Sequence, residues 1–184
     1  ADKLGLDRGK MFAVVSTFAF YYGVSLPKLA DLKWGNAEYY GWILAVTSIG
    51  SLIGALATAR LHLTRYMWVA SAALMLGVAN VGMAIAPNVW VAFVWAIPLG
   101  AGGAAMIAGA NSIITQEAPP DMRGRMLALT AVAFLGSTPI GGPITGLVAD
   151  YVSVSWSLAY GGIITLLAAA YMFGWIWVKD IEHA

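Results

Sequence analysis

The side chains of this chain that could do chemistry are uncharged hydrogen-bonding groups inside long apolar segments. They form two groups in two different segments, and each group lies on or beside one stripe of its own helix. The first group is Thr17, Tyr21 and Ser25, and the second is Asn111, Thr115 and Gln116. Polar side chains in hydrocarbon need partners or water, so both groups are expected to point inward. They could bind a small molecule along a substrate pathway, or they could only bond neighbouring helices.

Charged and metal-binding side chains are missing from the middle of every apolar segment. Asp150, the nearest carboxylate, lies at a segment end, where a wetted helix terminus is the simpler interpretation. The histidines, His62 and His183, lie in a loop and in the C-terminal tail, and the chain has no cysteine. The sequence therefore offers no proton-relay carboxylate, no haem or metal site and no catalytic triad. We expect no cofactor and no enzymatic activity.

Glycine and proline gather in two of the segments. Pro98 and Gly102 lie in one, and Pro139, Gly142 and Pro143 lie in the other, among further glycines. Proline inside a helix removes a backbone hydrogen bond and kinks the helix, and in a membrane the freed carbonyl must find a neighbour or water. These residues are therefore predicted to let two helices bend or rock beside a polar space. Static close packing of the small residues is the alternative.

The elements that would position these residues are membrane-spanning helices. Of 184 residues, 60% are hydrophobic and only 10% are charged, whereas a soluble domain has about a quarter charged. Crossing the hydrocarbon takes about 20 apolar residues in a helix, and no alternating strands of about 10 residues occur. The fold class is predicted to be all-α. The charge clusters separate six predicted spans: Met11–Leu29, Tyr40–Ala59, Tyr66–Ala86, Val89–Gln116, Arg125–Tyr151 and Trp156–Val178.

The basic residues indicate how the six spans are oriented. Lys28 and Lys33 fall on one side, and the other eight lysines and arginines fall on the opposite side. Cytoplasmic loops carry the excess of basic residues, so both termini are predicted to be cytoplasmic. Residues 1–10 would form a cytoplasmic linker, residues 11–178 the transmembrane domain, and residues 179–184 a cytoplasmic tail. Membrane lipid is an expected partner; nucleic acid is not, because no basic stripe is present.

The second and fifth spans share a short pattern. The stretch from Gly50 to Ala57 resembles the stretch from Gly142 to Ala149. Each lies in the middle helix of a three-helix group, and the two helices cross the membrane in opposite directions. An inverted repeat of three plus three helices would give this pattern. Small residues four apart are also common where membrane helices approach closely, and this explains the pattern equally well.

Three stretches of the later sequence carry a family resemblance. They are Ala110–Gln116, Pro119–Met126 with its Pro-Asp-Met-Arg-Gly-Arg segment, and the glycine- and proline-rich Phe134–Pro143. Together they resemble the C-terminal half of a major facilitator superfamily transporter, and more narrowly the bacterial drug and siderophore exporters of the enterobactin-exporter type. The resemblance implies that the six spans are helices seven to twelve of a twelve-helix transporter.

The resemblance also implies roles. The first and fourth helices of each half line the family's central cavity, and the third and sixth face lipid. Asp121, Arg123 and Arg125 would lie in a cytoplasmic loop whose ionic contacts help to close an inner gate; anchoring by positive charge is the simpler alternative. The implied function is proton-coupled export of small amphipathic molecules across the bacterial cytoplasmic membrane by alternating access, with the coupling groups in the first half.

Six helices are half of what such a transporter needs. We therefore expect the chain to be a fragment, to pair with a separate N-terminal half, or to be a half-size protein that dimerises. A different hypothesis is a transporter half reused as a non-transporting scaffold subunit of a larger membrane complex. The missing half and the lack of intramembrane carboxylates motivate this second hypothesis.

Overall fold

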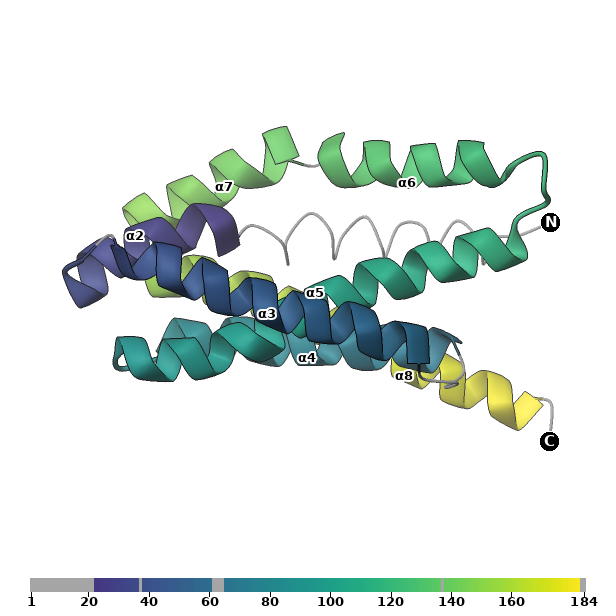
Figure 1. Cartoon of the computed structure of the whole chain (residues 1–184), viewed down its shortest axis with the longest axis horizontal. Coiled ribbons are helices and arrows are strands. Elements are labelled where there is room, and N and C mark those ends of the chain that lie inside the picture. The colour runs from purple at the N-terminus through teal and green to yellow at the C-terminus, as the bar shows by residue number, and fades with distance from the viewer. Residues whose placement is uncertain (1–21, 37, 61–64, 137, 183–184) are drawn as a thin grey trace.

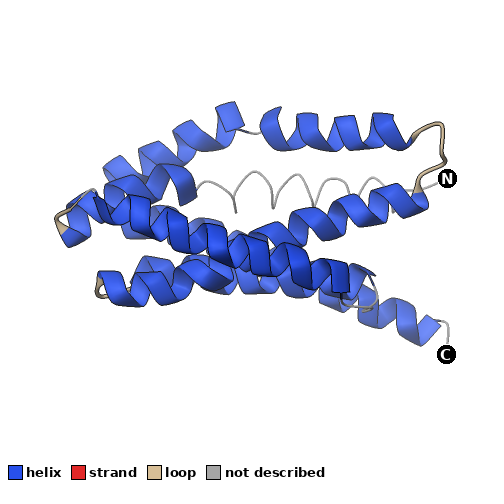
Figure 2. Ribbon diagram, viewed as in Figure 1, coloured by secondary structure: helices blue, strands red, loops and turns tan. Residues whose placement is uncertain are grey.

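The computed structural model describes residues 22–36, 38–60, 65–136 and 138–182, and within these residues the regular structure is entirely helical. Figures 1 and 2 show long helices that run lengthwise beside one another, with no strand among the described residues. The prediction of an all-α fold is confirmed. The helices are α2 (Tyr22–Trp34), α3 (Glu38–Arg60), α4 (Arg65–Ile85), α5 (Val89–Glu117), α6 (Arg123–Gly136), α7 (Thr138–Tyr151) and α8 (Val154–Glu182).

Four of the described helices are long and apolar enough to cross a membrane. They are Glu38–Arg60, Tyr66–Ile85, Val89–Glu117 and Val154–Gly174. These segments correspond to the second, third, fourth and sixth predicted spans, so the chain is a multi-pass membrane protein. Of the first predicted span only the part from Tyr22 on is described, as the 13-residue helix α2. The arrangement of six spans thus stays a prediction.

The fifth predicted span is divided into two helices, α6 and α7, of 14 residues each. Figure 1 shows the two helices following one another with a change of direction. Pro139 lies just after the junction; its nitrogen cannot donate a helical hydrogen bond, and in a continuous helix a proline ring clashes with the carbonyl four residues earlier. Residue 137, between the two helices, lies outside the described residues, so the kink stays a prediction. In contrast, α5 continues as one helix through Pro98.

Glycines bring α3 and α5 into backbone contact. A Cβ atom added to Gly50 would overlap the carbonyl oxygen of Ile97, and one added to Gly54 would overlap that of Ala101. From the other side, a Cβ on Gly100 would overlap the carbonyl oxygen of Thr47. Small residues of this kind are what let membrane helices approach closely. Gly50, Gly54 and Gly100 therefore serve packing.

Glycine also sets the contacts of α4, which lies between α5 and α8. A Cβ on Gly102 of α5 would lie 2.7 Å from the backbone nitrogen of Leu76. Gly102, one of the residues predicted to help α5 bend, lies at a position of close helix approach, as the packing alternative expects. Gly77 of α4 faces Gly162 of α8: a Cβ on either glycine would lie 3.1 or 3.0 Å from the carbonyl oxygen of the other.

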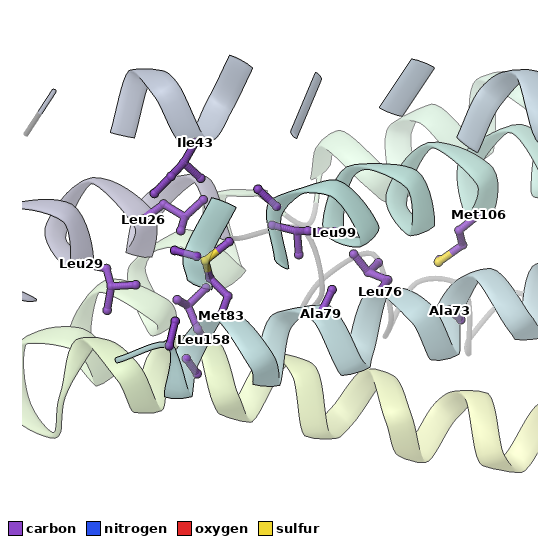
Figure 3. Close-up of a cluster of buried hydrophobic side chains, with 14 of the residues drawn as sticks. Leu26, Leu29, Ile43, Ala73, Leu76, Ala79, Met83, Leu99, Met106 and Leu158 are labelled. Atoms are coloured by element: carbon purple, nitrogen blue, oxygen red, sulfur yellow. The ribbon is translucent and has the colours of Figure 1, made fainter. Parts of the chain in front are cut away.

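The core of the described bundle joins α2, α3, α4, α5 and α8. Figure 3 shows Leu26, Leu29, Ile43, Met83 and Leu158 gathered where these helices meet, and all five side chains are buried. Of the most apolar 18-residue stretch of α4, 61% is buried inside the structure, a larger share than in any of the other three long helices. The third span was expected to face lipid; instead α4 is the most enclosed of these four helices.

Candidate functional site

The described part of the first polar group lies in a helix–helix contact. The side chain of Ser25 is fully buried, and its hydroxyl oxygen is hydrogen-bonded at 2.7 Å to that of Ser157 in α8. The Ser157 hydroxyl is also bonded at 2.7 Å to the carbonyl oxygen of Val154. Ser25 thus joins α2 to α8 and does not face an open polar space. Thr17 and Tyr21 lie outside the described residues.

We expect a double-mutant cycle at this pair to show strong coupling. Ser157→Ala leaves the buried Ser25 hydroxyl without its partner, which costs about 1–3 kcal/mol of unfolding free energy. Ser25→Ala should cost less, because Ser157 keeps its bond to Val154. The double variant should be more stable than the sum of the two losses predicts. Thermal unfolding of the purified protein in detergent measures all three, and strictly additive losses would contradict the pairing.

The second polar group lies together near the C-terminal end of α5. Asn111, Thr115 and Gln116 are all exposed. The Thr115 hydroxyl donates to the Asn111 carbonyl oxygen at 2.8 Å, and the Gln116 amide donates to the Ser112 hydroxyl at 2.7 Å. These bonds stay within α5, so the three side chains are turned away from the packed core. Figure 1 places this end of α5 far from α2, so the described residues of the two groups are not brought together.

The loop between α5 and α6 is a compact turn. The backbone nitrogens of Met122 and Arg123 donate to the carbonyl oxygen of Pro119 at 2.9 and 3.1 Å. The Arg123 guanidinium Nε donates to the carbonyl oxygen of the buried Ala118 at 3.1 Å, which satisfies a backbone acceptor just beyond the last turn of α5. Asp121 and Arg125 are exposed. Of the three predicted gate residues, Arg123 therefore has a structural role in closing the turn.

Sequence reasoning missed one contact beside this loop. The Tyr66 hydroxyl, at the start of α4, lies 2.6 and 2.7 Å from the two carboxylate oxygens of Glu117, the last residue of α5. A hydrogen bond to an ionised carboxylate is stronger than one between neutral groups. The only signal in the sequence was that both residues end apolar segments on the same predicted side of the membrane. This bond joins the ends of α4 and α5.

At the other end of α4, a lysine side chain joins α2 to α4. Lys33, in the last turn of α2, donates from Nζ to the carbonyl oxygen of Ala84 at 3.2 Å. Ala84 lies in the last turn of α4, where carbonyls lack helical partners and the helix dipole favours a cation. Desolvation by burial lowers the pKa of the Lys33 ammonium group. Lys33 was counted in the sequence only as a basic residue outside the spans, and the structure shows what it binds.

The described residues contain no group of three or more histidine, cysteine, aspartate or glutamate side chains that could hold a metal ion. The candidate site consists of uncharged polar groups at the end of α5 and the short basic loop that follows it. Together with the four long apolar helices, these features define a polytopic helical membrane protein.

The family model of the Major Facilitator Superfamily matches residues 11–184. The chain therefore belongs to this superfamily, whose members are generally transporters and not enzymes. A search of curated proteins found no match to this chain.

Proposed function

We propose that the chain is one six-helix half of a secondary active exporter that moves small amphipathic molecules by alternating access. The observation that carries this proposal is the family match over residues 11–184, because transport is what the family does. The membrane is the bacterial cytoplasmic membrane, with both termini in the cytoplasm as the distribution of basic residues indicates. Proton coupling is assigned to a second half, since no acidic residue lies near the middle of the long described helices.

The α4–α8 contact supports a three-plus-three inverted repeat. A Cβ on Gly77 would meet the carbonyl oxygen of Gly162 and the side chain of Leu166, four residues after Gly162. A Cβ on Gly162 would meet the carbonyl oxygen of Gly77 and the side chain of Val81, four residues after Gly77. Reciprocal contacts of this kind are the property of a two-fold axis. Such an axis between the third and sixth spans relates the two three-helix groups.

The other helix contacts agree with the same axis. It exchanges the second span with the fifth and the first with the fourth. The α3–α5 contact then corresponds to the α2–α7 contact, and the α4–α5 contact corresponds to the α2–α8 contact; both members of each pair occur. The α7–α8 contact departs from this scheme, because its counterpart between α3 and α4 is not among the substantial contacts of the described residues.

A second half would cover surfaces that this chain leaves open. Only 22% of the most apolar 18-residue stretch of α3 is buried. The side chains of Trp42 and Leu52 on this helix are 65% and 62% exposed. Lipid can cover such an apolar face. It cannot satisfy the exposed amides of Asn111 and Gln116 as well as a partner or a water-filled cavity can. We therefore assign the polar end of α5 to a substrate pathway shared with a second six-helix half.

Transport is tested by co-expressing the chain with a six-helix N-terminal half and measuring efflux in membrane vesicles. A panel of amphipathic dyes and siderophores is followed with and without a proton gradient. We expect gradient-dependent movement of at least one compound, absent from vesicles with either half alone. No movement across the whole panel, despite a stable complex of the two halves, contradicts the proposal.

The alternative function is that of a scaffold subunit in a larger membrane complex. The observation that favours it is the burial of Ser25 in packing, which removes one polar group from the predicted pathway. Purification in mild detergent separates the two functions. Stoichiometric association with unrelated membrane proteins supports the scaffold, whereas a homodimer or a complex with a second half supports transport.

A further inference from the structure

The last turn of α2 carries a positive charge that the described part of the chain does not neutralise. The Lys33 ammonium group donates to the carbonyl oxygen of Ala84 at 3.2 Å, which is an uncharged partner. Among the described residues, no carboxylate forms an ion pair with Lys33. An ammonium group has three donors, so two remain for a further partner. Burial of this charge has an electrostatic cost that an anion bound beside it would offset.

The Lys33 ammonium group lies at the boundary of the membrane. The long apolar segment of α4 runs from Tyr66 to Ile85, so Ala84 is its second-last residue. Figure 1 places the end of α2 at the same end of the bundle as the loop between α4 and α5. Lipid headgroups lie directly outside the hydrocarbon, at the depth where such a segment ends. The uncompensated charge is therefore at the level of the lipid phosphates.

Large apolar side chains border the bond between Lys33 and Ala84. Leu32, which precedes Lys33, is 73% exposed, and Ile85, which follows Ala84, is 71% exposed. Trp90, in the first turn of α5 at the same end of the bundle, is 73% exposed, and indole rings favour the headgroup level. A small soluble anion cannot cover such a border. A phospholipid can, because its acyl chains contact the apolar side chains while its phosphate faces the lysine.

We propose that the ends of α2 and α4 bind one anionic phospholipid, whose phosphate accepts from Lys33 while its chains cover Leu32 and Ile85. Lys33 is one of two basic residues on its side of the predicted topology, where positive charge is not needed for orientation. The lipid belongs to the outer leaflet in the proposed orientation, but the site itself does not depend on transport. The bound lipid adds a second connection between α2 and α4 to the bond that Lys33 makes directly.

Lipid contacts can be measured at chosen positions, because the chain has no cysteine. A fluorophore is attached at Ile85→Cys beside the site, or at Val152→Cys, a position 65% exposed at the turn between α7 and α8. The full chain is placed in phosphatidylcholine nanodiscs with a small fraction of spin-labelled phosphatidylglycerol or spin-labelled phosphatidylcholine as quencher. We expect phosphatidylglycerol to be preferred about fivefold at Ile85, as for one lysine near an anionic headgroup, and not at Val152.

Substitutions of Lys33 separate the effect of its charge from that of its packing. Lys33→Gln keeps an N–H donor but should abolish the preference at Ile85, whereas Lys33→Arg should retain it. Equal preferences at Ile85 and Val152, or an unchanged preference in Lys33→Gln, overturn the proposal. So does an absence of quenching by either lipid at Ile85, which would show that another protein surface covers the site. The two labelled positions in the Lys33 background decide the matter even where a variant does not fold.

Discussion

Gly54→Ala is expected to destabilise the protein by about 3 kcal/mol, at the upper end of what overpacking of a core costs. The added methyl group would lie on the carbonyl oxygen of Ala101, and Gly50, one turn earlier, faces the carbonyl of Ile97 in the same way. A flexible side chain could turn aside, but a helix backbone cannot, so α3 and α5 must separate along their length. Because typical domains are stable by about 5–15 kcal/mol, this loss is a large part of the stability and should clearly lower the temperature at which the protein unfolds.

The matched control is Gly41→Ala in the same helix. Nothing lies within 4 Å of a Cβ atom at this position. Alanine is better than glycine inside a helix by up to about 1 kcal/mol, so the control should be neutral or slightly stabilising. Both variants are compared by the fraction of monodisperse protein that survives heating in detergent. Equal survival of the two would show that the α3–α5 contact is not as close as described.

Asn111→Leu is expected to reduce efflux by the reconstituted pair of halves about tenfold. The side chain is exposed near the end of α5, and we assign it to the substrate pathway. Loss of one hydrogen bond to a polar ligand costs about 1.4 kcal/mol, which corresponds to a factor of ten. Initial efflux rates in vesicles at matched protein levels give the effect, and the variant should melt at the same temperature as the unsubstituted protein.

Ser48→Ala is a suitable control for this loss of polarity. Ser48 is also exposed in a membrane helix, but its hydroxyl donates to the Leu44 carbonyl of its own helix at 2.9 Å. Its removal should leave efflux unchanged. If both substitutions reduce efflux equally, general loss of polarity and not a place in the pathway explains the effect. If neither does, Asn111 does not line the pathway.

Spans were predictable because hydrophobic length is a local property of the sequence. The second predicted span, Tyr40–Ala59, lies within α3, and the fourth, Val89–Gln116, ends one residue before α5 does. The change of direction between α6 and α7, within the predicted span Arg125–Tyr151, appeared in the sequence only as a predicted kink. The presence of a proline indicates that a helix is interrupted, but the angle between the two helical segments depends on what each segment packs against. Among the described residues, α7 binds α8, whereas the substantial contacts of α6 are with α5 and α7.

The roles of small and polar residues were harder to predict, because each depends on a partner far along the chain. Gly102 and Pro98 look alike as helix-bending residues, yet Gly102 is required for contact with α4 while α5 continues through Pro98. Ser25 looked like part of a pathway, and its partner Ser157 lies 132 residues away. Likewise, composition does not distinguish an apolar helix that faces lipid from one that packs inside a protein, such as α4.

The facing glycines of α4 and α8 bear on how such a protein could arise by gene duplication. A contact that a two-fold axis maps onto itself needs only one residue, since the same position supplies both sides. In the three-plus-three repeat that we propose, one glycine in an ancestral three-helix peptide, inserted in both orientations, would have been enough to hold two copies together before their genes were joined. Gly77 and Gly162 have the geometry of such a contact, each against the other's carbonyl oxygen.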